Sequence, residues 1–462
     1  MKVLLLNLPS DIQCARVLHR SNLQKPGYRW PPVDFVCLSG FLWEAGFTLD
    51  YKDFQLDSAI TIWEYLEAHS YDFIISTYSP FFEEQDLTLL QEIKRIHPKT
   101  RILLLANHRD RLEPDHPKRI LSGHPFIFAM VYDYAHHNVA SFMEKGPSGD
   151  LFNVLFMKNG DLWGRIDPIP RRVAIPVPRH DLFISDAYFH YDSVGGRLTS
   201  TMSSFGCRQQ CPFCWGPKLY PAVTVRTSEN LISEMEHIAS CGIQEVYFND
   251  LTFAYDRKTV LEFCRSMIAH RIRLRWFCSS RFDLMTAETI EAMAQAGCRC
   301  IEFGLESGNY PVRKLYGKDF PDSTVDKVLR LCKSHGIHTS VFIILGLPEE
   351  TLSDMQRSID FVLERDFDYL SLNVLWAEPF TAFDRKIDST AENIPRTQYA
   401  QSINFKHPHA SSDQIEALYR RSFRRFYLDP GFMLRQIGSI RSLKKIRNLM
   451  SIVMDLAGKD RY

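Results

Sequence analysis

Long apolar runs are missing from this sequence of 462 residues. No stretch approaches the roughly 18 uninterrupted apolar residues that a membrane span needs, so we expect no stable membrane insertion. The N-terminus has only four consecutive apolar positions, Val3–Leu6, after one lysine. This run is too short for the core of a secretion signal and fits a first buried strand better. We therefore expect a cytoplasmic protein without disulfides.

An excess of charge of either sign is missing too. Fifty-five Lys and Arg balance 55 Asp and Glu, so the net charge gives no indication of a nucleic-acid partner. Hydrophobic residues make up 45% and charged residues 24%, as is ordinary for a soluble globular protein. The length exceeds that of one ordinary domain and allows two cores and an appendage.

Residues 1–145 alternate short apolar runs with amphipathic stretches, which predicts a parallel sheet with helices on both faces. Five strands suit a doubly wound, Rossmann-like domain of the flavodoxin type, whose ligand would lie beyond the carboxyl ends of the strands. The expected strands are Val3–Asn7, Thr48–Phe54, Phe73–Tyr78, Ile102–Ala106 and Phe126–Tyr132. Residues 146–194 are predicted to be a linker, because a hairpin-like piece around Asn159 is followed by a proline-rich segment.

Residues 195–380 form a second alternating series, and its six βα units favour an open, partial (β/α)6 barrel. Chemistry in that architecture sits at the carboxyl ends of the strands. The expected strands are Leu198–Ser203, Glu245–Asn249, Leu274–Cys278, Cys300–Leu305, Thr339–Leu345 and Tyr369–Val374. Residues 381–462 look mostly helical, and within them Ser402–Ser412 is expected to be a mobile connection that closes over substrate.

A basic stretch, Arg420–Arg447, contains nine Lys or Arg and one acidic residue, interleaved with apolar positions. Such a helix could lie on an anionic membrane or bind an acidic partner. The interpretation that we favour is a solvated face of helices that pack on their own domain.

The eleven cysteines divide into eight scattered ones and a triplet, Cys207, Cys211 and Cys214. The triplet is spaced C-x3-C-x2-C and directly follows the first predicted barrel strand, which places it on a loop over the barrel mouth. Thiolates are natural ligands for iron–sulfur clusters and for zinc. A structural zinc needs four ligands, usually in two pairs, and this loop holds no fourth Cys or His. Three thiolates suit a cubane cluster that keeps one iron open to a small molecule.

This spacing, with the aromatic Phe213 before the third cysteine, resembles the signature of the radical S-adenosylmethionine (SAM) superfamily. The resemblance implies a 4Fe-4S cluster on the three cysteines and SAM bound at the open iron. It also implies reductive cleavage of SAM to methionine and a 5′-deoxyadenosyl radical. The protein would bind and orient these groups and exclude water.

Further segments resemble that family in the correct order, each after a predicted strand. Asp250 matches an acidic position that holds the SAM amino group, and Arg281 matches a polar position near SAM. Glu306 and Ser307 match the segment that contacts the ribose and carboxylate, and Gly346 matches a turn beside the adenine and methionine. Each match alone would be ordinary turn chemistry. Together with the triplet they imply one SAM site within about residues 195–380.

In one branch of the superfamily a doubly wound domain precedes the barrel and binds cobalamin. Arg29–Pro32 resembles the opening of that branch and is expected to close one side of the cobalamin site. The resemblance implies cobalamin contacts from Ser76, Tyr78, Ser79 and His108. No D-x-H-x-x-G motif is present, so the cobalt is expected to lack a histidine ligand from that motif.

Two departures from the branch support the alternative that this domain has lost its cofactor and only braces the barrel. Leu105-Ala106-Asn107 stands where the branch usually has two glycines before His108. Val131–His137 replaces a turn that is usually rich in glycine and glutamate. Side chains in place of glycine would crowd the nucleotide tail of the cofactor.

The function implied first is a cobalamin-dependent methyltransferase that acts on an unactivated carbon or phosphorus centre of a small molecule or peptide. An electron donor such as flavodoxin or ferredoxin would reduce the cluster. A second enzymatic interpretation uses the same radical for ring closure, oxidation or rearrangement without cobalamin. Outside enzymes, the alternative is a zinc-binding scaffold.

Overall fold

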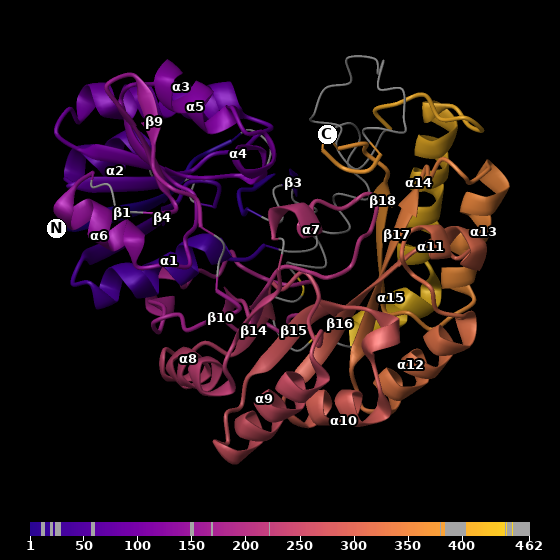
Figure 1. The fold of residues 1–462 in the computed structure, drawn as a ribbon. Helices are drawn as coiled ribbons and strands as arrows, with labels where there is room; N and C mark the ends of the chain where they lie inside the picture. The colour runs from indigo at the N-terminus through magenta and orange to yellow at the C-terminus, as the bar shows by residue number, and fades with distance from the viewer. Residues whose placement is uncertain are drawn as a thin grey trace.

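A computed structural model shows two large sheets, each flanked by helices (Figure 1). The structure describes residues 1–10, 14–18, 22–23, 29–56, 61–147, 152–167, 170–220, 222–378, 380–383, 403–438, 440 and 446. Among these residues no helix has the length and apolarity to cross a lipid bilayer.

The first sheet contains the five parallel strands expected from the sequence. They are β1 (Lys2–Asn7), β4 (Thr48–Asp53), β5 (Phe73–Thr77), β6 (Arg101–Leu105) and β7 (Ile127–Val131). Their order in the sheet, β4-β1-β5-β6-β7, is the flavodoxin-like order, whose ligand site lies where the order reverses beside β1. The continuous apolar run of β1 is explained by its position, since helices cover a parallel sheet on both faces. These helices are α1 (Val33–Glu44), α2 (Ile62–Ala68), α3 (Glu83–Ile96), α4 (His108–Leu112), α5 (His116–Gly123) and α6 (Asn138–Lys145).

Part of the predicted linker belongs to this first sheet, which corrects the expected boundary. Strands β8 (Val154–Lys158) and β9 (Asp161–Trp163) form an antiparallel hairpin on the β7 edge. The turn contains Asn159 (φ 54°) and Gly160 (φ 85°), the left-handed conformations that favour these two residue types. Leu155 and Phe156 are buried, so the hairpin completes the core and covers an otherwise open strand edge.

The proline-rich segment behind the hairpin packs against α1 at Gly40. A Cβ atom at Gly40 would lie 2.0 Å from the carbonyl oxygen of Pro176, a distance that no atom pair tolerates. We expect Gly40→Ala to lower the free energy of unfolding by about 1–3 kcal/mol, measured by chemical denaturation, because the packed segment must shift. Gly123→Ala is the matched control, since a Cβ there has no neighbour within 4 Å. Equal stability of the two variants would contradict this contact.

The second sheet has the six parallel strands predicted for the partial barrel. They follow one another in chain order: β11 (Leu198–Thr201), β14 (Glu245–Phe248), β15 (Arg275–Ser280), β16 (Cys298–Glu306), β17 (His338–Leu345) and β18 (Tyr369–Val374). The connecting helices lie along the outer face in Figure 1: α8 (Ser228–Ser240), α9 (Arg257–Ala269), α10 (Ala287–Gln295), α11 (Tyr310–Leu315), α12 (Asp322–Ser334) and α13 (Leu352–Leu363). All carboxyl ends therefore point to one opening.

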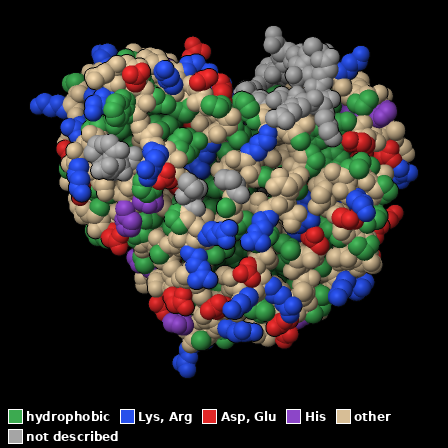
Figure 2. All heavy atoms as spheres, viewed as in Figure 1, with side chains coloured by type: hydrophobic (Ala, Val, Ile, Leu, Met, Phe, Trp, Pro, Cys, Tyr) green, Lys and Arg blue, Asp and Glu red, His purple; other side chains and the backbone are tan. Residues whose placement is uncertain are grey.

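Two C-terminal helices, α14 (Ser412–Tyr427) and α15 (Pro430–Gly438), follow the barrel. The Tyr427 hydroxyl donates to the Leu370 carbonyl oxygen (2.7 Å), so α14 covers the exposed edge of β18. Arg425 pairs with Asp360 of α13 at 2.7 Å, while Phe426 is buried. The described part of the basic stretch is thus a solvated helix face on its own domain, as favoured from the sequence; most of residues 439–447 lies outside the described residues. On the face drawn in Figure 2, Lys and Arg side chains are interspersed with Asp and Glu.

Candidate active site

The cysteine triplet lies on the loop between β12 (Ser204–Phe205) and α7 (Gly216–Leu219), directly after the first barrel strand. Gly206 starts this loop at φ 91°, and a Cβ there would lie 2.7 Å from the Ala222 carbonyl oxygen. Only glycine permits this entry. All three thiols are half-buried.

Two of the three thiols have polar neighbours. The Gly216 amide donates to Cys214 Sγ at 3.3 Å, and Cys207 Sγ lies 3.4 Å from Thr252 Oγ1. Burial raises the pKa of Cys211 and raises the pKa of Cys214 to about 12. Iron would have to displace these protons, since a metal binds the thiolate form.

Asp250 braces the base of this loop. Its carboxylate accepts from the Ser203 amide (2.9 Å), the Ser203 hydroxyl (2.6 Å) and the Ser204 hydroxyl (2.5 Å). Burial raises the pKa of Asp250 despite these donors. The structure therefore gives Asp250 a positioning role for the cluster loop, and its contact with the SAM amino group stays a prediction.

Arg281 follows β15 and is buried beside the thiols. It makes two hydrogen bonds to Asp283 (2.9 and 2.8 Å) and one to the Gly317 carbonyl oxygen (2.9 Å). Burial lowers the pKa of Arg281, but the nearby Asp283, Cys211 and Cys207 raise it by a larger amount. The net pKa is raised, so Arg281 stays charged. Its Nη1 atom is buried without a hydrogen-bond partner among the described residues. Such a donor fits an anionic group bound next to the cluster.

Glu306, at the end of β16, forms a buried ion pair with Lys318 (3.2 Å), a residue that the sequence analysis missed. Glu306 has φ 68°, a left-handed conformation that costs energy for a non-glycine residue and occurs often at functional sites. A Cβ at Gly304 would lie 2.5 Å from both charged atoms, so the glycine makes room for the pair. The sequence analysis took its candidate residues from segments directly after predicted strands. Lys318 does not directly follow a strand, so it was missed.

Aromatic stacking holds the cluster loop against two neighbouring segments. Phe213 stacks on Tyr316 (6.1 Å between ring centroids), and Tyr316 stacks on Phe383 (5.6 Å). The Ala382 amide donates to the Pro212 carbonyl oxygen at 3.1 Å. The loop is therefore fixed from the β16 side and from the segment after β18.

The Ser307 hydroxyl faces Glu350. Its hydroxyl donates to Glu350 Oε1 at 2.5 Å, and burial raises the pKa of Glu350 to about 7. Gly346 (φ 85°) lets Ile403 approach, since a Cβ there would lie 3.1 Å from Ile403. Gly346 thus lies between the barrel and the C-terminal region.

The connection predicted to be mobile is anchored over its described part, residues 403–411. The Asn404 side chain exchanges two hydrogen bonds with the Ala377 backbone (2.7 and 2.9 Å). His407 Nε2 lies 3.1 Å from the Leu347 carbonyl oxygen. These contacts tie the segment to the β17 and β18 ends, and its closure over substrate stays a prediction.

The four predicted cobalamin contacts lie at the carboxyl ends of β5 and β6, and all are buried. Three of them bond within their own domain: Tyr78 OH donates to Asp110 (2.6 Å), the Ser79 amide to Asp86 (2.8 Å), and Ser76 Oγ to Leu6 O (3.2 Å). The fourth faces the barrel: the His108 ring stacks on Trp215, with 3.8 Å between ring centroids.

The Arg29–Pro32 segment makes contacts with the second sheet. Trp30 stacks on Tyr247 of β14 (4.6 Å between centroids), and Pro31 O accepts from Ser200 Oγ at 2.6 Å. The segment therefore joins the N-terminal domain to the second sheet, because its indole finds an aromatic partner there. Arg29, Trp30 and Pro32 also line a small cavity with Asn7, at the end of β1, and Asp53, at the end of β4, and their place beside the cobalamin site stays a prediction.

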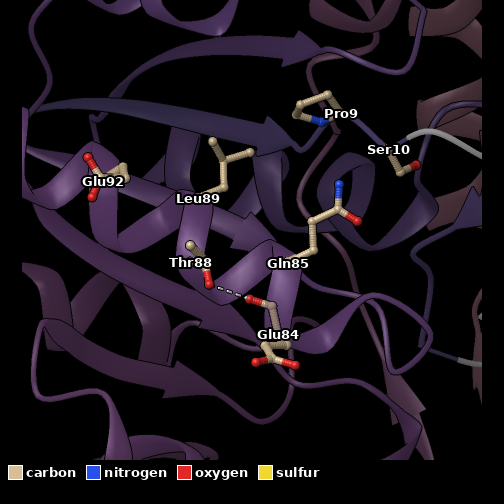
Figure 3. A pocket seen from close by; sticks show the side chains of 7 residues that line it. All are labelled: Pro9, Ser10, Glu84, Gln85, Thr88, Leu89 and Glu92. Carbon is tan, nitrogen blue, oxygen red and sulfur yellow. Dashed lines mark hydrogen bonds between the residues drawn. The ribbon is translucent and has the colours of Figure 1, made fainter.

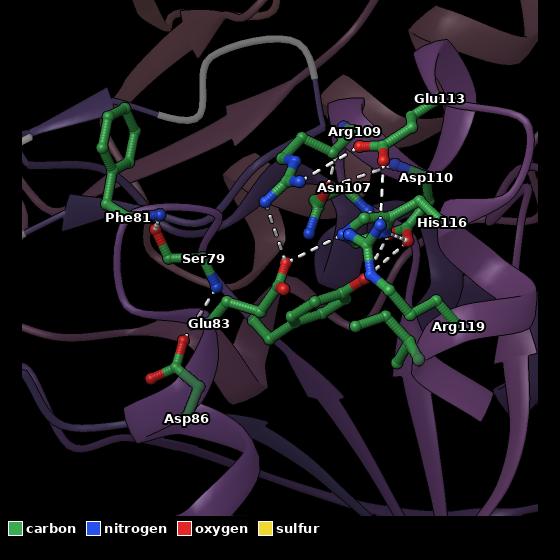
Figure 4. Close-up of polar contacts among 12 residues, drawn as sticks. Ser79, Phe81, Glu83, Asp86, Asn107, Arg109, Asp110, Glu113, His116 and Arg119 are labelled. Carbon is green, nitrogen blue, oxygen red and sulfur yellow. Dashed lines mark hydrogen bonds and ion pairs between the residues drawn. The ribbon is translucent and has the colours of Figure 1, made fainter. Parts of the chain in front are cut away.

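A buried polar network braces the carboxyl edge of β5 and β6 (Figure 4). His116 lies between Asp110 (2.6 Å) and Glu83 (2.9 Å), and its side chain is fully buried. Burial lowers the pKa of His116, but the two carboxylates raise it to about 9. The network fixes α3, α4 and α5 relative to one another.

We expect His116→Gln to destabilise the protein most at low pH. A folded-state pKa of about 9, above the unfolded value, gives stability that is full below pH ~6.5 and is lost as the pH rises through 9. Denaturation at pH 6 and pH 9 should show the difference from wild type shrinking with pH. His270→Gln, at an exposed pair with Glu236, is the control and should change little. A pH-independent difference would contradict the charged state of His116.

An open groove of about 670 Å³ lies between the loop after β1 and α3 (Figure 3). Its lining residues are Pro9, Ser10, Glu84, Gln85, Thr88, Leu89 and Glu92. None of them belongs to the cluster loop or to the strand ends of the second sheet. We therefore place the chemistry at the thiols and not in this groove.

Comparison with known proteins agrees with this geometry. Residues 202–362, which hold the triplet and most of the barrel, match the Radical SAM superfamily. An uncharacterised methyltransferase of Pyrococcus horikoshii is 28% identical over 57% of this chain and 58% of its own length. The hopanoid C-2 methylase of Rhodopseudomonas palustris is 26% identical over 56% of this chain and 49% of its own length. The chain thus spans about half the length of these curated relatives.

Two further similarities extend over more of the chain. The anaerobic magnesium-protoporphyrin IX monomethyl ester cyclase of Rubrivivax gelatinosus is 21% identical over 87% of this chain and 75% of its own length. The structure of the radical SAM methyltransferase TsrM from Kitasatospora setae, with cobalamin and a [4Fe-4S] cluster bound, has a TM-score of 0.63. It covers 91% of this chain and 85% of that chain at 17% identity. Residues 202–362 therefore match the radical SAM superfamily, and the chain has the fold of the TsrM structure.

Proposed function

We propose that this protein is a radical SAM methyltransferase that uses a 4Fe-4S cluster, SAM and cobalamin. One observation carries the proposal: three half-buried thiols lie at the barrel mouth next to two buried cations, Arg281 and Lys318. The cluster supplies an electron that cleaves SAM, and cobalamin carries a methyl group. The chain's own residues bind, orient and shield these groups.

The donor set fits the cluster and SAM. Cys207, Cys211 and Cys214 would hold three irons and leave the fourth open. SAM carries an amino and a carboxylate group at its reactive end, and the Glu306–Lys318 pair offers one charge of each sign beside Cys211. Arg281 offers a further donor through Nη1.

The fold has a suitable place for the proposed cobalamin site. The flavodoxin-like order puts its site at the carboxyl edge of the first sheet, and α4 at that edge packs against α7 of the cluster loop. Asn107 Nδ2 and Arg111 Nε, at this edge, are buried donors without partners among the described residues. Cobalamin presents many acceptors, namely its amide carbonyls and a phosphate. We propose that the methyl acceptor is an unactivated carbon or phosphorus centre of a small molecule or peptide.

Ring closure is a second candidate activity. The cyclase relative matches a larger share of this chain than the two methylases do. The same SAM site would then make the radical, while the N-terminal domain would only brace the barrel. A zinc scaffold requires four ligands around one ion, and the loop that carries the three thiols holds no fourth Cys or His.

Anaerobic reconstitution tests the proposal. The protein would be given iron, sulfide, hydroxocobalamin, SAM with a deuterated methyl group, and a reductant. We expect a broad absorption near 400 nm, 5′-deoxyadenosine as a product, and transfer of the label to the bound corrinoid. 5′-Deoxyadenosine without cobalamin retention would favour ring closure or related chemistry. No iron binding would overturn both candidates. Reduced flavodoxin and ferredoxin, compared with dithionite, would identify the class of electron donor.

A further inference from the structure

A buried carboxyl group lies behind the strand ends of the second sheet, in the turn after β17. Glu350 is fully buried, and its Oε1 atom accepts a hydrogen bond from the Ser307 hydroxyl (2.5 Å). The Ser358 hydroxyl of α13 lies 3.5 Å from the same oxygen and 3.2 Å from Ser307 Oγ. These three side chains join the turn after β17, helix α13 and the loop after β16.

Glu350 is a costly residue to bury at this place. Burial and the nearby carboxylates of Asp354 and Glu349 raise its pKa to about 7. Its Oε2 atom is buried without a hydrogen-bond partner among the described residues, although a buried polar atom normally has one. An apolar side chain of similar size would avoid this cost. Stability alone therefore does not explain why a carboxyl group stands here.

The loop that Glu350 holds begins with a strained residue. Ser307 directly follows Glu306, whose φ of 68° costs energy and persists only where the surroundings fix the backbone. Beyond Ser307, the Gly308 amide donates to Ser358 Oγ at 2.9 Å. A Cβ at Gly308 would lie 2.8 Å from Ser358 Cα, so the loop packs directly on α13. The chain is thus clamped immediately after its strained residue.

We propose that Glu350 is a positioning residue for SAM. Through Ser307 it holds Glu306 in the conformation in which the Glu306 carboxylate meets Lys318. This inference rests on the proposed function, in which that charge pair faces the amino and carboxylate groups of SAM. Glu350 has no contact with SAM and no part in the chemistry, because it acts through the Ser307 hydroxyl.

Binding of SAM to the cluster-reconstituted protein tests the inference. Equilibrium dialysis measures the affinity, and SAM at the open iron should also change the EPR signal of the reduced cluster. We expect Glu350→Met, which removes the acceptor and keeps much of the volume, to weaken binding about tenfold. Glu350→Gln should keep most of the affinity, because its amide oxygen still accepts from Ser307. Without SAM, both variants should show the EPR signal of wild type.

Glu245→Met is the matched control. Glu245 is also fully buried and accepts a hydrogen bond from the Val194 amide (2.9 Å), but it lies at the amino end of β14, the opposite end of the strands. Its replacement should lower the stability and leave SAM affinity unchanged. If Glu245→Met weakened SAM binding as much as Glu350→Met, the effect would reflect stability alone and the inference would be wrong.

A double-mutant cycle shows whether Glu350 acts through the charge pair. In the Glu306→Gln/Lys318→Met background, adding Glu350→Met should weaken SAM binding by less than about twofold, because the pair that it positions is gone. A further loss of about tenfold in this background would overturn the inference. If Glu350→Met does not fold, Ser307→Ala, which removes the same hydrogen bond, takes its place in the cycle.

The outcomes separate this inference from the proposed function. If wild type binds SAM and Glu350→Met binds it equally well, the inference is wrong and the proposed function stands. If Glu350→Gln binds as weakly as Glu350→Met, the hydrogen bond to Ser307 is not responsible and the inference is wrong too. If wild type holds no cluster and binds no SAM, the proposed function itself is wrong.

Discussion

Replacing Cys207, Cys211 and Cys214 together with alanine is expected to abolish iron binding and SAM cleavage while the protein stays folded. The thiols are half-buried on a loop and contribute little to either core. Without thiolates the site has no soft ligands for iron. Each single variant should also lose an intact cluster, because three ligands are the minimum for a cubane with one open iron. Iron and sulfide analysis, absorption near 400 nm and 5′-deoxyadenosine formation measure the loss.

Cys241→Ala is the matched control for the triplet. Cys241 is half-buried like the triplet but follows α8, at a distance from the loop in sequence. It should keep wild-type iron content and SAM cleavage. If the control lost the cluster and the triplet variant kept it, the assignment of the ligands would be wrong.

Lys318→Met is expected to destabilise the protein by about 3 kcal/mol and to weaken SAM binding at least tenfold. The stability loss arises because the Glu306 carboxylate stays buried without its cation. The affinity loss arises because Arg281 is then the one remaining buried cation beside the thiols among the described residues, and the SAM carboxylate loses the charge of Lys318. Thermal denaturation and SAM binding to the reconstituted protein measure the two effects separately.

The double variant Glu306→Gln/Lys318→Met separates structure from function. It removes both charges, so most of the stability should return, while SAM affinity should stay low. Lys314→Met is the control, since its pair with Asp319 is exposed and should contribute little. Restored SAM affinity in the double variant would show that the pair has only a structural role.

The strands could be predicted and the cysteine triplet could be located on one loop, because both depend on local sequence. Apolar runs such as Val3–Leu6 must be buried, and their alternation with amphipathic helices leaves few ways to build a sheet. The C-x3-C-x2-C spacing is a property of one loop. The hairpin around Asn159 was predicted to lie in a linker. Its apolar side chains become buried only when the hairpin pairs with β7, and the local sequence does not indicate this pairing.

The partners of the site residues could not be predicted, since they are separated in the chain. Lys318 lies between α11 and α12 and pairs with Glu306 at the end of β16. Glu350 lies after the next strand, β17, and accepts a hydrogen bond from Ser307. Asp250 turned out to brace Ser203 and Ser204, a contact that no spacing indicates. The direction of a side chain at a strand end depends on the neighbouring strands. The sequence alone does not show which strands are neighbours in the sheet.

The sequence by itself determined the strands of the two sheets, the cysteine triplet and the match of residues 202–362 to the radical SAM superfamily, because periodicity and short motifs act within a few residues. Only the tertiary structure decided which charges meet beside the thiols and which rings join the two halves. Trp30 shows the difference: its indole stacks on Tyr247 of the barrel, a contact that its motif does not indicate. Contacts between distant segments depend on the packing of whole elements, and a large ring is buried where the assembled surfaces leave room for it.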